Sequence, residues 1–124
     1  MSTVATTIIP LQVTVTATGV AIARGARLTL NSSGLCAASA IGVRGDYIAL
    51  QDIAADGKGL AAPVGSGGSV PCIASETTVV GDAAYSAASG KVSKTSGGGA
   101  VLMGKWLQVA TADTLGVVQL QSVA

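Results

Sequence analysis

The chain has 124 residues, a formal net charge of +1 and no histidine, and only 10% of its residues are charged. An ordinary soluble domain carries about 25% charged residues. This balance argues against a basic nucleic-acid-binding surface and against imidazole-based catalysis or zinc binding. The length fits one domain. A surface so poor in charge could stay soluble through its many Ser and Thr, but we expect it to be covered by copies of the chain or by a partner.

The first 23 residues contain no charged side chain. They lack the basic start of a signal peptide, and Pro10, Gln12 and several threonines interrupt any membrane-spanning stretch. The sequence therefore predicts no targeting segment and no membrane partner. Residues 1–10 are expected to form an extended arm that becomes ordered only when a partner holds it. The candidate contacts in this arm are Thr6, Thr7, Ile8, Ile9 and Pro10.

Residues 11–124 are expected to form a single β-rich domain. Val13 and Val15 alternate with polar neighbours, as do Val118 and Leu120 near the end of the chain, which is typical of half-buried strands. The segment "IAADGKGLAAPVGSGGS", residues 53–69, is rich in glycine and is predicted to be a long loop. The fold class is all-β, a small single-domain sandwich or barrel of short antiparallel strands. The predicted strands span residues 11–17, 26–31, 35–42, 46–52, 69–75, 83–86, 91–94, 100–110 and 115–122.

Glycine and aspartate mark the expected turns between these strands. The clearest hairpin is "GDAAYSAASGKVS", where the loop of residues 87–90 ends at Gly90, which supplies a positive φ. Most acidic residues stand beside Gly or Thr, where an aspartate commonly accepts a hydrogen bond from the backbone two residues further on. The structural turn residues are predicted to be Gly45, Asp46, Gly81, Asp82, Gly90 and Asp113.

The stretch "SGGGAVLMGKW" has the spacing of a phosphate-binding loop, with Gly99, Gly104 and Lys105 in the diagnostic places. However, Trp106 stands where the Mg²⁺-binding Ser or Thr should be, and no strand precedes the loop. The stretch is therefore interpreted as a turn that leads into a packed strand. Trp106 is expected to be a large anchor, either in the core or at a seam between copies.

No constellation of side chains predicts catalysis. Cys36 and Cys72 lack activating neighbours in the sequence and are interpreted as small buried hydrophobic residues, although a disulfide between them stays possible in principle. Arg24, Arg27 and Arg44 could form a small basic patch, but they lack the aromatic residues that stack on nucleic-acid bases. We predict a protein that is not an enzyme and has no cofactor, no metal and no nucleic-acid partner.

From about Arg44 onwards, the order of these turns resembles the head decoration, or cement, proteins of tailed bacteriophages. The stretches that carry the resemblance are "GDYIALQDIAADGKG", "PVGSGGSV", "VVGDAAYSAASGKVS", "GGGAVLMGKWLQVATAD" and "GVVQLQ". They cover roughly two-thirds of the chain, whereas Trp106 and the uncharged arm are not part of the family pattern.

The resemblance implies a non-catalytic virion protein, made in the host bacterial cytoplasm, that binds the exterior of the capsid. Its expected partners are the major capsid protein and other copies of the chain, as a homotrimer or a dimer. The arm contacts named above would then touch the capsid or a neighbouring subunit. Two alternatives are a structural or adhesive β-module of a phage tail or cell-surface layer, and a nucleotide-dependent enzyme, which the failed phosphate-loop match disfavours.

Overall fold

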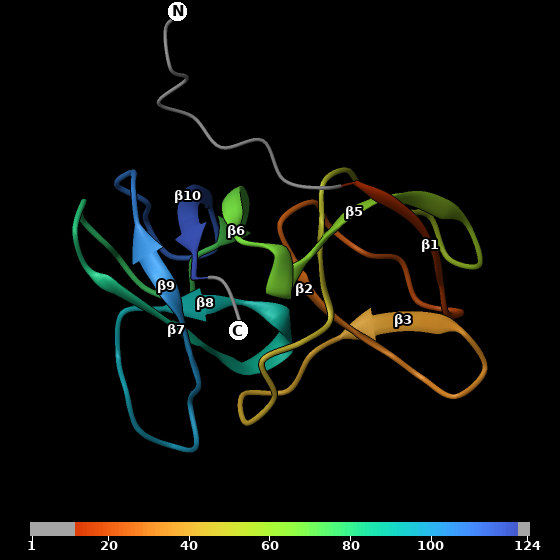
Figure 1. Cartoon of the computed structure of the whole chain (residues 1–124), viewed down its shortest axis with the longest axis horizontal. Coiled ribbons are helices and arrows are strands. Elements are labelled where there is room, and N and C mark those ends of the chain that lie inside the picture. Colours follow the sequence, from red (N-terminus) through yellow and green to blue (C-terminus); the bar gives the residue numbers. More distant parts are fainter. Residues whose placement is uncertain (1–11, 122–124) are drawn as a thin grey trace, which may run out of the picture.

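The computed structural model describes residues 12–121, which form ten short strands arranged as two halves side by side (Figure 1). The first half is a closed five-stranded barrel with the strand order β1-β3-β2-β4-β5. Its pairs are antiparallel except for β1 and β3, which run parallel. The strands of the barrel are β1 (Val13–Ala17), β2 (Arg27–Leu30), β3 (Leu35–Ala38), β4 (Tyr47–Ala49) and β5 (Lys58–Pro63).

The second half is a five-stranded antiparallel sheet with the order β6-β10-β9-β7-β8. A bridge between Ala74, just after β6, and Val92 in β8 brings the two edges of this sheet together. Two single turns of 3-10 helix lie at Val64–Ser66 and Ala88–Gly90. None of the helices in residues 12–121 is long and apolar enough to cross a membrane. The strands are β6 (Gly68–Ile73), β7 (Ala83–Ser86), β8 (Val92–Ser93), β9 (Leu102–Trp106) and β10 (Leu115–Leu120).

The molecule has two apolar clusters, and the one in the second sheet also includes Ile48 and Ala62 from the barrel strands β4 and β5. The expected all-β class is confirmed. In β10 the side chains of Val118 and Leu120 are buried, whereas Gln119 between them is half-buried and Gln121, just after the strand, is exposed, as the alternation predicted. Small residues dominate both clusters, and the largest buried side chain is that of Trp106 in the second sheet. A chain without phenylalanine therefore fills its interior with many small contacts and one indole.

The prediction of a long loop over residues 53–69 is wrong, because β5 occupies Lys58–Pro63. The strand pairs with β1 on one edge and with β4 on the other, so tertiary pairing overrides its weak local preference. Gly59 is required there, since a Cβ at this position would approach the Ile53 side chain to 2.6 Å. The expectation that every pair is antiparallel is also corrected by the parallel pairing of β1 with β3.

Candidate interaction surfaces

Arg27 joins the two halves of the molecule, a role that the sequence did not indicate. The side chain leaves β2 and is fully buried. Its guanidinium donates hydrogen bonds to five backbone carbonyls and to no carboxylate. Burial lowers the pKa of Arg27 to about 10. The carbonyls belong to Ala40, Val43 and Arg44 in the connection between β3 and β4, and to Ala87 and Lys91 beside β8.

The basic patch considered from the sequence does not form. Arg27 points into the interior, whereas Arg44 is half-buried and donates from its guanidinium to the carbonyl of Gln121 at 2.7 Å. Arg24 is exposed near Asp52, whose carboxylate accepts the backbone N–H of Arg24 at 2.8 Å. The three side chains therefore lie at three separate places in the fold and form no common basic surface.

The predicted turn glycines adopt the left-handed conformations that turns need, with φ of 94° at Gly45, 94° at Gly81 and 73° at Gly90. Gly90 also lies against Arg27, because a Cβ there would approach the Arg27 carbonyl oxygen to 2.9 Å. Its N–H donates to the carbonyl of Ser39 at 2.8 Å. This hairpin loop therefore docks on the barrel and helps to fix the junction between the halves.

The aspartates accept hydrogen bonds from the backbone, but the expected partner two residues further on is wrong. Asp46 accepts the N–H of Leu30 in β2 at 2.8 Å, and Asp82 accepts the N–H of Val79 at 2.9 Å. The carboxylate of Asp113 pairs with Lys91, and its backbone φ is 64°. Asp46 and Asp113 thus connect segments that are distant in the sequence, whereas Asp82 closes its own local turn.

Trp106 lies in the core of the second sheet, where its indole Nε1–H donates to the carbonyl of Ser93 at 3.0 Å. Gly104, the second glycine of the apparent phosphate loop, lies inside β9, where the backbone of β10 runs very close. A Cβ on Gly104 would be 1.9 Å from the carbonyl oxygen of Gln119. This glycine therefore serves strand packing, in agreement with the interpretation of the stretch as a turn and a strand.

A rigid apolar knob stands at the outer end of the second sheet. It consists of Val79, Val80 and Val109, which are 50%, 65% and 61% exposed. Backbone hydrogen bonds in both directions between Thr78 and Ala110 hold the two loops that carry it. An apolar surface that is already ordered loses little conformational entropy when a partner covers it. The knob is therefore suited to protein contact.

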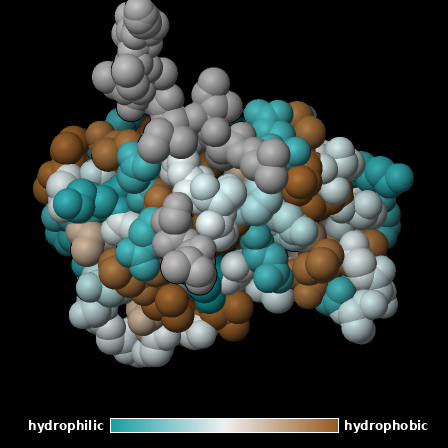
Figure 2. Space-filling model, viewed as in Figure 1, coloured by the Kyte–Doolittle hydropathy of each residue, from teal (hydrophilic) through white to brown (hydrophobic). Residues whose placement is uncertain are grey.

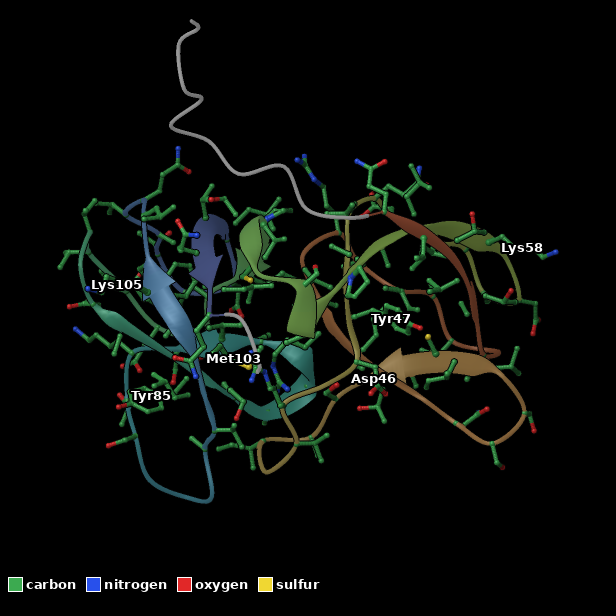
Figure 3. The ribbon with its side chains drawn as sticks, viewed as in Figure 1. Asp46, Tyr47, Lys58, Tyr85, Met103 and Lys105 are labelled. Carbon is green, nitrogen blue, oxygen red and sulfur yellow. The ribbon has the colours of Figure 1, made fainter. Side chains whose placement is uncertain are left out.

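A shallow hollow of about 480 Å³ lies next to the knob on the outer face of β9 and β10. Leu102 and Leu107 supply its apolar walls, and Lys105 and Gln119 contribute polar groups. In Figure 3, Lys105 lies in the second half, while Lys58 lies at the opposite end of the molecule, beyond Asp46 and Tyr47. Figure 2 shows apolar patches interspersed with hydrophilic and intermediate surface on the visible face. Exposed apolar side chains therefore supply much of the surface that a partner could contact.

The described residues offer little for catalysis. Burial raises the pKa of Cys72 to about 12 and also raises the pKa of Cys36, so both free thiols are held in the unreactive protonated form. Within residues 12–121 no group of three or more His, Cys, Asp or Glu side chains could hold a metal ion. The arm contacts Thr6, Thr7, Ile8, Ile9 and Pro10 lie outside the described residues.

Comparison with solved structures places this fold among known all-β proteins. The N base of the head fiber protein gp8.5 of bacteriophage phi29 superposes with a TM-score of 0.69 and 17% sequence identity. The match covers 90% of this chain and 95% of that chain, so the two share the fold over nearly their whole length. No protein-family model and no curated protein matches the sequence.

Proposed function

We propose that the chain is a non-enzymatic structural protein of a bacteriophage virion that binds the outer surface of the capsid. It acts as a homo-oligomer, a trimer in the form we favour, and stabilises the shell by bridging subunits of the major capsid protein. The observation that carries the proposal is the match of the whole domain with the base of a phage head fiber. The order of turns that resembles cement proteins points to the same class from the sequence.

The surface supports this proposal on physical grounds, since a shared fold alone does not define a function. A stable protein contact buries about 800 Å² on each partner. Small apolar and hydroxyl side chains can be covered without desolvating unpaired charges. The knob of Val79, Val80 and Val109 would be buried in the assembled shell. Several weak contacts made by one oligomer would add through a high effective concentration at the shell surface.

The test is to add purified protein to phage heads assembled without it and to measure cosedimentation. Val80→Asp places a charge on the knob and should weaken binding at least tenfold while leaving the fold intact, since Val80 is 65% exposed. Ala55→Asp adds the same charge at an exposed turn of the barrel and is the matched control. Failure of the wild-type protein to bind heads would contradict the proposal. Equal binding of the two variants would show that the knob is not part of the contact with the capsid.

A further inference from the structure

An apolar hollow of about 490 Å³ lies where the barrel meets the second sheet. Its walls are mainly small side chains from three regions: the segment after β1, the end of β3 and the end of β6. Val20, at its rim, is 70% exposed. The residues that matter most here are Val20, Ala21, Ala23, Ala37 and Ala38.

The segment after β1 also presents a free backbone edge. Ile22 exchanges two hydrogen bonds of 2.8 Å with Ile53, so its neighbours Ala21 and Ala23 direct their backbone groups to the opposite side. The N–H groups of Ala21 and Ala23 and the carbonyl of Ala21 bond to no other described residue. An extended peptide could pair with such an edge while its side chains enter the hollow.

The polar groups around the hollow favour an uncharged occupant. Lys91 supplies the charge in the lining, and its ammonium group is already paired with Asp113. Ser89 at the rim has a φ of 58°, a conformation that few non-glycine residues adopt and that often occurs where a ligand or chain is held. A segment without charged side chains, with branched apolar residues, matches this lining.

We propose that residues 1–11 of a second copy dock in this hollow as an added strand, an inference that rests on the proposed homo-oligomer. The sequence "MSTVATTIIPL" contains no charged side chain and is rich in Thr, Val and Ile, which favour strands. In a strand one of the neighbouring residues Ile8 and Ile9 faces the hollow, and either supplies a large apolar side chain for a lining that consists mainly of alanines. Docking of the arm would connect subunits and also clamp the junction between the two halves.

The length of the arm favours exchange between copies. The described chain enters β1 at Val13, whereas the hollow begins beyond the far end of β1, beside Ala37 and Ala38. An arm that returned to its own hollow would use about four residues to reverse direction and then run back along the five residues of β1. Counted back from β1, Ile8 and Ile9 would then fall in the reversal at the start of this strand and not in the hollow. The arm of a neighbour has no such restriction.

The experiment is disulfide cross-linking in the full chain. Cysteine is introduced at Thr7, Ile8 or Ile9, each combined with Ala37→Cys, and mild oxidation is followed by denaturing electrophoresis without reductant. The matched control combines the same arm positions with Lys105→Cys on the outer hollow of β9. The wild-type protein, whose two native cysteines are buried, gives the background.

At least one Ala37 combination should give covalently linked subunits in more than half of the material, with the Lys105 controls near background. Intramolecular links alone, no links at any arm position, or equal linking in the controls would each overturn the docking proposal. Light scattering on the wild-type protein separates the two ideas. An oligomer without cross-links contradicts only the docking of the arm, whereas a monomer contradicts the proposed homo-oligomer itself.

Discussion

Replacing Arg27 with methionine should cost about 3–5 kcal/mol of folding free energy, because buried acceptors left without a donor cost about 1–3 kcal/mol each and the lost charge desolvation offsets part of this. The five carbonyls that the guanidinium now satisfies would lose their donor. Hydrogen bonds to charged groups contribute about 1.5–3 kcal/mol each. Burial lowers the pKa of Arg27 to about 10, so the desolvation of the charge opposes part of this gain. A loss of about 3–5 kcal/mol is a large part of the 5–15 kcal/mol that stabilises a typical domain.

Two further variants make this prediction specific. Arg27→Lys should be intermediate, because one ammonium group cannot reach carbonyls in both halves as a planar guanidinium does. Arg24→Met is the matched control, because the Arg24 side chain is exposed and the change should stay within about 0.5 kcal/mol. The assay is urea unfolding followed by circular dichroism and by Trp106 fluorescence. If Arg27→Met is as stable as Arg24→Met, the assigned role of Arg27 at the junction is incorrect.

Three other changes test the packing and the thiols. Trp106→Ala should cost about 3–5 kcal/mol of unfolding free energy in the same urea assay, and Trp106→Phe distinctly less, because it leaves a smaller cavity. Equal losses of stability would contradict this dependence on side-chain volume. Gly104→Ala should cost at least 1–3 kcal/mol through its clash with the carbonyl of Gln119, whereas Gly19→Ala, with no atom within 4 Å of the added Cβ, should be nearly neutral. The pKa of Cys72 is higher in the folded state than the ordinary value of 9.0, so its contribution is complete below pH 9 and is lost as the pH rises towards 12. The burial of the Cys72 thiol should therefore lower the unfolding free energy by about 1.4 kcal/mol between pH 8 and 10, and Cys72→Ala should reduce this dependence on pH; an unchanged dependence would contradict the role of this thiol.

Local sequence patterns were sufficient to predict strands with one buried face and turns that need a glycine. The alternation at Val118 and Leu120 identified a strand with one buried face, and the loop before Lys91 placed a positive φ at Gly90. These features depend on neighbours only a few positions away, which a sequence displays directly.

Features that depend on distant pairing could not be predicted in this way. The strand β5 has a glycine-rich sequence and exists because β1 and β4 pair with both its edges. Arg27 looked like a surface cation, since nothing local shows that five carbonyls from two loops converge on it. The sequence shows a glycine at position 104, but only the structure shows why it is needed: the backbone of β10 passes too close for a Cβ.

The central claim, that the chain decorates the outside of a phage head as an oligomer, is tested most directly by cryo-electron microscopy. Heads of the phage that encodes the chain should be compared with heads assembled without it. The account predicts additional density for several copies on the outer surface, at junctions between capsid subunits. Identical heads in the two preparations, or density for the chain on the tail or inside the shell, would contradict it.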